Sequence, residues 1–166
     1  AKNFNISYLE GGMKLVTDGQ GGKVLLLQDG QTAPEEYGDL PSIVIPISKV
    51  ICSSTTQVGY LRAFPDEDLF DSIVGVRATA ADWDFDAMHS RMESGQIVDI
   101  GSNTTMSTSY DYEIIQSLMP NIVFTNAGMG TEQTELMAML DEAGISYVFD
   151  ASGSETDYKG ILEWVK

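Results

Sequence analysis

Short apolar runs alternate with helix-like stretches along most of the chain. Runs rich in β-branched and other apolar residues occur at 43–47, 50–52, 73–76, 97–100, 121–125 and 145–149. Between these runs, apolar residues recur every three or four positions, which is the spacing of one face of an amphipathic helix. Strands that alternate with helices are typical of a parallel sheet covered on both faces. The pattern therefore predicts an α/β fold.

The first forty residues have a different pattern. Three β-like runs, at 4–9, 14–17 and 24–28, are separated by Gly-Gly and Asp-Gly pairs. Such pairs favour close turns, so we predict a small β meander here. A polar link follows the meander and leads into the α/β pattern. We therefore expect two parts, a meander with its link at 1–40 and an α/β lobe at 41–166.

Capping signals mark the starts of two predicted helices. Ser54 or Thr55 can cap the first helix of the lobe. Ser154, followed three residues later by Asp157, resembles a capping signal for a last helix at 155–166. This last helix is strongly apolar and has no stop signal, so we expect that it continues in a longer chain.

The chain is strongly acidic. Its 166 residues include 9 Lys or Arg and 25 Asp or Glu, which gives a formal net charge of −16. Nucleic acids and anionic lipids attract basic surfaces, so we expect no nucleic-acid partner. An acidic surface suits docking to a basic partner protein. No apolar run approaches the length of about 18 residues that spans a bilayer, so we expect no direct membrane insertion.

Metal and nucleophile chemistry have little support in the sequence. The chain has one cysteine, Cys52, in an apolar run, and one histidine, His89, in a separate helical stretch. A closed transition-metal site needs several such ligands, and a reactive thiol needs a nearby base. We therefore expect Cys52 to be a small buried hydrophobe. Because the pattern also has no catalytic triad, P-loop or paired acids, we expect no catalysis, no metal site and no intrinsic cofactor.

Two motifs leave alternatives open. Positions 1, 3, 5 and 12 of a calcium loop are matched by Asp82, Asp84, Asp86 and Glu93, but alanine replaces the glycine of position 6. Acidic residues at a helix start also favour the helix dipole, which is the simpler interpretation. The second motif, Asn-Ala-Gly-Met-Gly at 126–130, has only one Gly-x-Gly. It indicates a tight turn more than a nucleotide site.

A polar loop follows the strand predicted at 97–100. Apart from Met106, the residues at 101–109 are glycine or have hydroxyl or amide side chains. Loops at the carboxyl ends of parallel strands are where open α/β sheets bind ligands. Trp83 lies in another loop, where it could stack on a flat ligand, although core packing is the commoner role of tryptophan. The pattern thus favours binding over chemistry.

Four segments, taken in order, carry a family resemblance. They lie at 50–56, at 72–76 with its IVGV strand, at 97–101 with 112–123, and at 162–164. The third is the most specific, because it has DIG followed by E-x-I-x-x-L-x-P-D-x-V, with Asn121 in place of the Asp. Together they resemble the N-terminal lobe of class III substrate-binding proteins of ABC importers, which serve iron–siderophore, haem and cobalamin uptake.

The resemblance implies an extracytoplasmic lobe, periplasmic or on a cell-surface lipoprotein, that delivers a metal chelate to ABC permease subunits. The chelate would be transported ligand rather than resident cofactor. Glu113 matches the family's lobe-surface glutamate, which pairs with arginine on the permease. Ligand contacts in the family come from loops at strand ends. In this sequence these positions are Ser54, Thr55, Trp83, Asn103, Thr104, Met106, Asn126 and Met129.

Two departures limit what the resemblance implies. The second lobe, which closes over the ligand, is absent from the sequence, so we expect weak ligand binding by this chain alone. The arginine cluster of anionic-siderophore binders is also absent, which leaves haem, a corrinoid or a neutral chelate as candidates. Two other functions stay open, namely an enzyme on a doubly wound α/β fold and a standalone acidic interaction domain.

Overall fold

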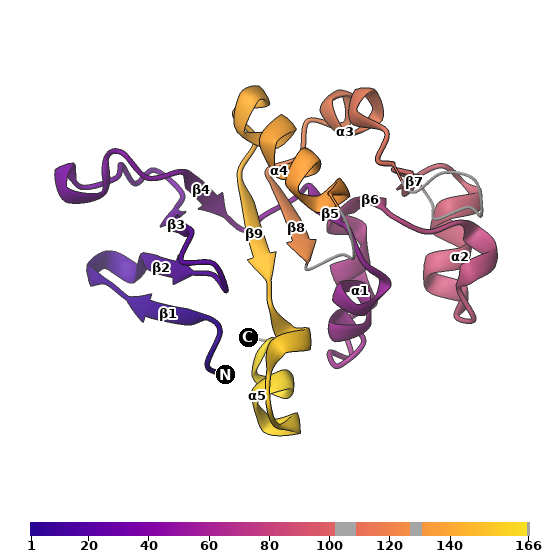
Figure 1. The fold of residues 1–166 in the computed structure, drawn as a ribbon, viewed down its shortest axis with the longest axis horizontal. Helices are drawn as coiled ribbons and strands as arrows, with labels where there is room; N and C mark the ends of the chain where they lie inside the picture. The colour runs from indigo at the N-terminus through magenta and orange to yellow at the C-terminus, as the bar shows by residue number, and fades with distance from the viewer. Residues whose placement is uncertain (102–108, 127–130, 166) are drawn as a thin grey trace.

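The computed structural model describes residues 1–101, 109–126 and 131–165, which form two β-sheets with helices (Figure 1). The first sheet contains β1 (Asn5–Tyr8), β2 (Lys14–Thr17), β3 (Lys23–Gln28) and β4 (Ser42–Ile45). The second contains β5 (Val50–Cys52), β6 (Ile73–Val76), β7 (Val98–Asp99), β8 (Ile122–Asn126) and β9 (Tyr147–Asp150). The α-helices are α1 (Thr55–Leu61), α2 (Asp86–Glu93), α3 (Tyr112–Leu118), α4 (Glu132–Ala143) and α5 (Tyr158–Glu163). Short 3₁₀ helices lie at Glu10–Gly12, Glu35–Tyr37, Glu67–Ser72, Ala80–Asp82 and Ser152–Ser154.

The second sheet is entirely parallel, with the strand order β7-β6-β5-β8-β9. Within this sheet, the central strand β5 comes first along the chain. The strands β6 and β7 follow on one side of β5, and β8 and β9 then follow on the other side. In open sheets of this kind, ligands bind in the crevice that such a reversal forms at the carboxyl ends of the strands. The predicted α/β fold with a parallel sheet is therefore confirmed.

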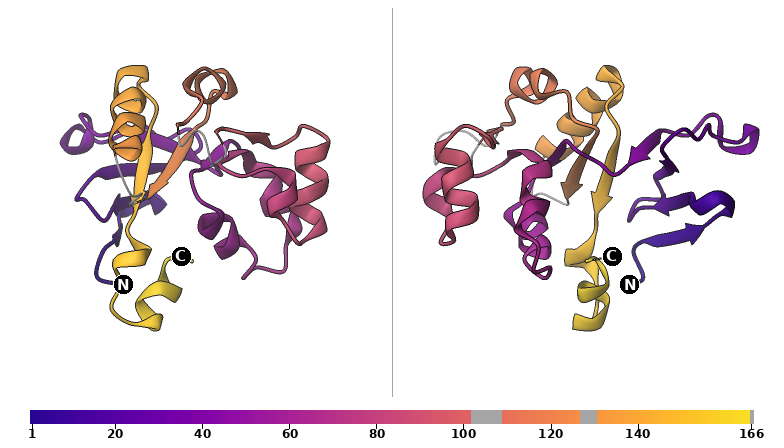
Figure 2. Two further views of the ribbon diagram at one scale, coloured as in Figure 1. Left: turned by 45° about the vertical axis from the view of Figure 1, so that its right-hand side comes forward. Right: turned by 180° about the vertical axis from the view of Figure 1, so that it is seen from behind.

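Helices cover both faces of the parallel sheet (Figure 2). Ile51 of the central strand packs with Leu136 of α4 on one face. The next residue, Cys52, lies in the core on the other face with Val58 of α1. Side chains that alternate between two buried faces explain why these strands are continuous apolar runs.

The first sheet begins as the predicted antiparallel meander of β1, β2 and β3. The strand β4 then pairs with β3 in parallel, so the apolar run at 43–47 belongs to the first sheet rather than to the parallel one. The polar link at 32–41 makes this possible, because it carries the chain back to the start of β3, where the Leu25 amide donates to the Pro41 carbonyl at 2.9 Å. The first sheet is therefore mixed rather than purely antiparallel.

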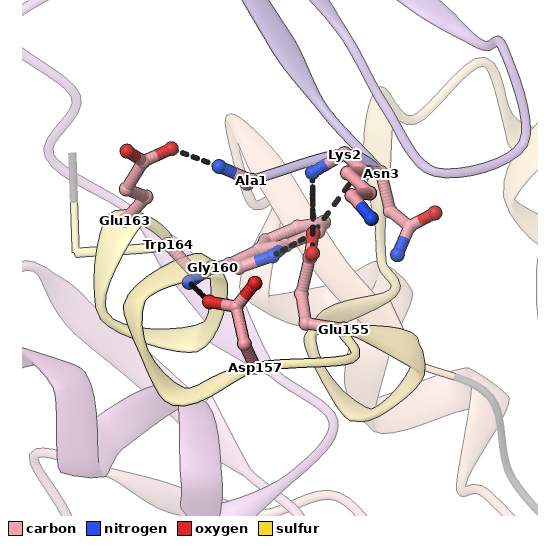
Figure 3. Close-up of polar contacts among 8 residues, drawn as sticks. All are labelled: Ala1, Lys2, Asn3, Glu155, Asp157, Gly160, Glu163 and Trp164. Carbon is pink, nitrogen blue, oxygen red and sulfur yellow. Dashed lines mark hydrogen bonds and ion pairs between the residues drawn. The ribbon is translucent and has the colours of Figure 1, made fainter.

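The start of the chain lies beside α5, and one carboxylate ties the two together (Figure 3). Glu155 accepts hydrogen bonds from the backbone amides of Lys2 and Asn3, at 3.0 and 3.1 Å, and from the indole N–H of Trp164 at 3.2 Å. The Phe4 ring also packs against the Trp164 ring, with centroids 4.6 Å apart. We call these contacts the Glu155 clasp.

The last helix begins later than the sequence pattern predicts. Asp157 is its N-cap and accepts a hydrogen bond from the Gly160 amide at 2.8 Å. Ser154 instead ends a 3₁₀ helix, and Glu155 has an extended backbone and takes part in the clasp. In the part of the chain that the structure describes, no helix has the length and apolar character needed to cross a membrane.

Candidate ligand-binding site

A cluster of polar side chains occupies the carboxyl edge of the parallel sheet, at the point where the strand order reverses. Ser53 follows β5, Arg77 follows β6, and Asn126 ends β8. Tyr110 precedes α3, and Gln133 lies in the first turn of α4. Five side chains, each in or next to a different strand or helix, therefore converge at this edge of the sheet, and we call them the switch-point cluster.

Asn126 connects the two central strands through its side-chain oxygen. This oxygen accepts from the Ser53 hydroxyl at 3.3 Å and from Gln133 Nε2 at 2.8 Å. Gln133 Nε2 also donates to the Tyr110 hydroxyl oxygen. Ser53 and Gln133 are only 4% and 6% exposed, so these hydrogen bonds form away from bulk water. Buried side-chain networks of this kind fix the positions of their members.

Arg77 is the basic member of the switch-point cluster. Its Nε donates to the Gly101 carbonyl at 3.0 Å, and its Nη1 donates to the Tyr110 hydroxyl at 3.4 Å. Its guanidinium also lies over the Tyr110 ring, 4.5 Å from the centroid. An ion pair with Glu132, with Nη2 and Oε2 3.3 Å apart, offsets its charge within the site.

One atom of the cluster is left without a partner. Gln133 Oε1 is buried and meets no hydrogen-bond donor in the described part of the chain. Buried carbonyl oxygens are normally paired, and each exception asks for an explanation such as a bound group. Among the described residues, Gln133 Oε1 is thus the atom of the cluster whose burial the hydrogen bonds do not explain.

A second buried polar group lies beside the cluster, at the end of β9. Asp150 accepts from Gln57 Nε2 at 3.3 Å and from the Ser152 amide at 2.8 Å. Burial, with a further contribution from the Asp150 charge, raises the pKa of the Cys52 thiol to about 12. The thiol is therefore neutral at physiological pH and unsuited to nucleophilic attack. The expected role of Cys52 as a buried hydrophobe is confirmed.

Of the residues expected at the site, Asn126 lies in the switch-point cluster. Ser54 caps α1, where its hydroxyl accepts from the Thr56 amide at 3.2 Å, and Thr55 is exposed at the same helix start. The remaining strand-end positions, Asn103, Thr104, Met106 and Met129, lie outside the described residues. Their part in ligand binding stays a prediction.

Trp83 is a core residue in this structure. Its side chain is 9% exposed, its indole N–H points at Met92 Sδ at 3.1 Å, and its ring meets the Phe85 ring edge-on at 5.7 Å. Apolar neighbours on this face of the sheet explain the burial. The indole is therefore not presented to the crevice, in contrast to the stacking role that the loop position suggested.

Glu113 lies in the first turn of α3 and is exposed. The capping role at this helix belongs to Asp111, whose carboxylate accepts from the Ile114 amide at 3.0 Å. Since Asp111 already caps the helix, the exposed carboxylate of Glu113 is available for contact with a partner.

The four acidic residues of the calcium-like motif, Asp82, Asp84, Asp86 and Glu93, are all exposed. No group of three or more His, Cys, Asp or Glu side chains suited to a metal ion occurs in the regions that the structure describes. Asp82 instead accepts from the amide and the hydroxyl of Thr79, at 2.7 and 2.8 Å, and these hydrogen bonds lower the pKa of its carboxyl group. The motif thus supplies a cap for the 3₁₀ helix.

An apolar cavity of about 360 Å³ lies between the two sheets, and Gln57 and Asp150 are among the residues that line it. Side chains from β1 to β3, from β5, β8 and β9, and from α1 line it, together with Trp164 and Val165. Its lining has little of the polar character of the switch-point cluster. We place the candidate site at the switch-point cluster because the strand order of the parallel sheet reverses there.

Sequence patterns missed four members of this cluster. Ser53 and Arg77 each stand immediately after a predicted strand, and that position alone could have identified them. Tyr110 and Gln133 gave no comparable signal, because they reach the crevice through the packing of α3 and α4 on the sheet.

The parallel sheet with its strand order β7-β6-β5-β8-β9, covered by helices on both faces, has the fold of one lobe of a class III binding protein. The fold that the family resemblance implied is thus confirmed. Two crystal structures of the heme binding protein HmuT, one of them a point mutant, match the chain with a TM-score of 0.50 and 17% sequence identity. The alignments cover 83% of this chain and 32% or 34% of HmuT.

A relative with a curated description is the uncharacterized lipoprotein MJ0878 of Methanocaldococcus jannaschii, which is 27% identical over 186 aligned residues. The alignment covers 100% of this chain and 44% of the relative, so the chain spans less than half of the length of MJ0878. No family model matches the chain.

Proposed function

We propose that this chain is the N-terminal lobe of a substrate-binding component of an ABC importer, and that it carries a metal chelate to a membrane permease. The candidate ligands are an iron–siderophore, haem and a cobalamin-type corrinoid. The observation that carries the proposal is the buried switch-point cluster with its orphaned Gln133 acceptor. The fold shared with the heme binding protein HmuT supports it.

The proposed role is binding and delivery, without catalysis. Arg77, Tyr110 and Gln133 are fixed by one another and by the backbone, which suits recognition of a ligand surface. The high pKa of the Cys52 thiol argues against Cys52 as a nucleophile.

We propose an extracytoplasmic location, in a periplasm or on a lipid anchor. The description of MJ0878 as a lipoprotein supports this location. An importer needs its binding protein on the outer side of the membrane, where the ligand is first encountered. The strong negative charge of the chain also agrees with a protein that meets a basic permease surface.

We further propose that a second lobe completes the site. The crevice is one wall, and a ligand bound to it alone would keep much of its surface in water. MJ0878 and HmuT are both more than twice as long as the aligned region, which leaves room for such a lobe in a protein of this kind. By itself, this chain should therefore bind ligand weakly.

The test is calorimetry on the full-length gene product with four probes, namely haem, cyanocobalamin, ferrichrome and ferric enterobactin. We expect submicromolar binding of at least one probe, and a loss of about tenfold or more on N126A, because Asn126 orders the cluster. The matched control N5A, on the exposed strand β1, should bind normally. Failure of all four probes to bind would overturn the proposal.

A further inference from the structure

The apolar cavity between the two sheets lies on one face of the parallel sheet. Alternate residues of β5, β8 and β9, such as Cys52, Phe124 and Val148, form its floor. Alternate residues of β1, β2 and β3 line it from the first sheet, and Tyr60 and Leu61 line it from α1. Its volume of about 360 Å³ falls within the range of about 300–1,000 Å³ that is typical of small-molecule sites.

Aromatic rings make up much of the lining of this cavity. They belong to Phe4, Tyr8, Tyr60, Phe64, Phe124 and Trp164. Tyr8 is 76% exposed, so the cavity reaches the protein surface at this ring. The face of an aromatic ring attracts a cation, and the Lys14 Nζ already lies 5.9 Å from the centroid of the Tyr8 ring. The lining therefore suits an apolar molecule and can also receive a positive charge.

A buried carboxylate, that of Asp150, belongs to the same lining. Asp150 is 7% exposed and accepts from the Ser152 amide at 2.8 Å and from Gln57 Nε2 at 3.3 Å. Both donors are neutral, and Gln57 Nε2 also donates to the Thr125 carbonyl at 3.2 Å. No lysine, arginine or histidine in the described part of the chain forms an ion pair with Asp150. Since buried carboxylates are normally paired with a cation, the wall of the cavity carries an uncompensated negative charge.

The other charged residue of the lining, Lys14, does not neutralise Asp150. Its ammonium group lies by the exposed Tyr8 ring, whereas Asp150 is buried, and the described residues show no ion pair between the two. The net charge of −16 on the whole chain also attracts cations and repels anions at long range. Charge complementarity therefore favours a cationic occupant.

We propose that this cavity is a second binding site, and that it takes a small organic ammonium ion with an apolar body. The ammonium group donates to the Asp150 carboxylate, and the body lies among the aromatic rings. A carboxylate has about four acceptor positions, and the Ser152 amide and Gln57 Nε2 occupy two, so acceptor capacity remains. None of the five residues of the switch-point cluster, all of which the structure describes, lines the cavity. The site is thus independent of the proposed function.

The test is calorimetry on the full-length gene product with two probes of matched shape, phenethylamine and 3-phenylpropionate. Both have a phenyl ring on a two-carbon chain, and they differ in the charge of the group at its end. We expect phenethylamine to bind with a Kd of about 0.1 mM or lower, at least about tenfold more tightly than 3-phenylpropionate. D150N should reduce this preference to about twofold or less, whereas D39N, at an exposed aspartate outside the lining, should retain it.

Two neighbouring substitutions on β2 test the location of the site. Val16 lines the cavity, whereas Leu15 is not part of the lining and alternates to the other face of the strand. V16F adds a ring inside the cavity and should weaken phenethylamine binding about tenfold or more. L15F makes a matched change on the same strand and should leave the affinity unchanged.

The outcomes decide the inference without reference to the importer function, which the chelate probes test separately. Failure of phenethylamine to bind, or binding of 3-phenylpropionate as tightly or more tightly, would overturn it. An unchanged preference in D150N, or an unchanged affinity in V16F, would overturn it as well. The comparison of the two probes on the unmodified protein decides the inference even if a variant does not fold, and circular dichroism shows whether each one does.

Discussion

Arg77, just after β6, reaches across the carboxyl edge of the sheet to Glu132, the first residue of α4, with Nη2 and Oε2 3.3 Å apart. The pair joins the two halves of the parallel sheet on either side of the reversal point. Their side chains are 13% and 23% exposed, so solvent screens the interaction only in part. The pair therefore sets both the charge of the crevice and part of its rigidity.

Removal of the Glu132 charge should change which ligands the crevice accepts. In E132Q the guanidinium charge of Arg77 is no longer offset by this carboxylate, so affinity for the anionic probe ferric enterobactin should rise about three- to tenfold. The free energy of unfolding should fall by about 1–2 kcal/mol, a value between those of exposed and buried ion pairs. Calorimetry and urea denaturation give the two quantities.

The matched control for this change is E135Q, one turn further along the same helix, where the side chain is exposed. It alters the net charge of the protein by the same amount without touching Arg77. If E132Q and E135Q raised the affinity equally, long-range charge rather than the Arg77 ion pair would determine anion exclusion.

The Glu155 clasp should make the contact between chain start and α5 sensitive to acid. Burial opposes ionisation of Glu155, but hydrogen bonds from Asn3, Trp164 and Lys2 outweigh it, so the pKa of its carboxyl group is lowered. A carboxyl whose pKa is lower in the folded state stabilises the fold above its unfolded pKa, and this contribution is lost as the pH falls through the folded pKa. The clasp should thus be complete at pH 7 and weaken in acid, as the pH falls below the usual pKa range of a glutamate and through the lowered pKa of Glu155.

Trp164 reports on the clasp, because its indole N–H donates to Glu155. The melting temperature and the tryptophan fluorescence should differ most between the unmodified protein and E155Q at neutral pH, and the difference should shrink in acid. E36Q, at an exposed glutamate in the first sheet's connecting segment, serves as the control. A stability difference for E155Q that did not depend on pH would contradict the ionic nature of the clasp.

Trp83 should matter for stability and not for ligand binding. As a buried core side chain, it should cost about 3–5 kcal/mol of unfolding free energy when replaced by alanine, whereas Y8A, at a ring that is 76% exposed, should cost little. W83F keeps an aromatic ring in the core and should bind ligand as tightly as the unmodified protein in calorimetry. Loss of affinity in well-folded W83F would show that the indole contacts ligand after all.

The fold was largely predictable because each strand and helix carries its own periodicity. The apolar run at 50–52 and the helical spacing of Ile114, Ile115 and Leu118 are local signals, and the parallel sheet follows from their alternation. The run at 43–47 was assigned to the wrong sheet because its own residues read as a strand in either sheet. Its pairing with β3 depends on the path of the link before it, which no local pattern records.

The site was predictable only in part, for a similar reason. The position of Asn126 at the end of a strand identified it, and the same rule extends to Ser53 and Arg77. Gln133 contributes through the way α4 packs on the sheet, and its importance rests on an atom that lacks a partner among the residues that the structure describes. Unsatisfied hydrogen-bonding groups are properties of the packed structure, so sequence patterns do not reveal them.

Glu113 should act in transport rather than in ligand binding. Its carboxylate at the start of α3 is exposed, and Asp111 already caps the helix. We expect E113A in the full-length protein to reduce ligand uptake by cells about tenfold or more while its affinity in calorimetry stays unchanged, because a docking charge acts on the permease contact. E142A, at an exposed glutamate near the end of α4, should transport normally. Because the contact is proposed to be ionic, E113D should restore part of the uptake, whereas a loss of affinity in E113A would place Glu113 at the ligand instead of the permease.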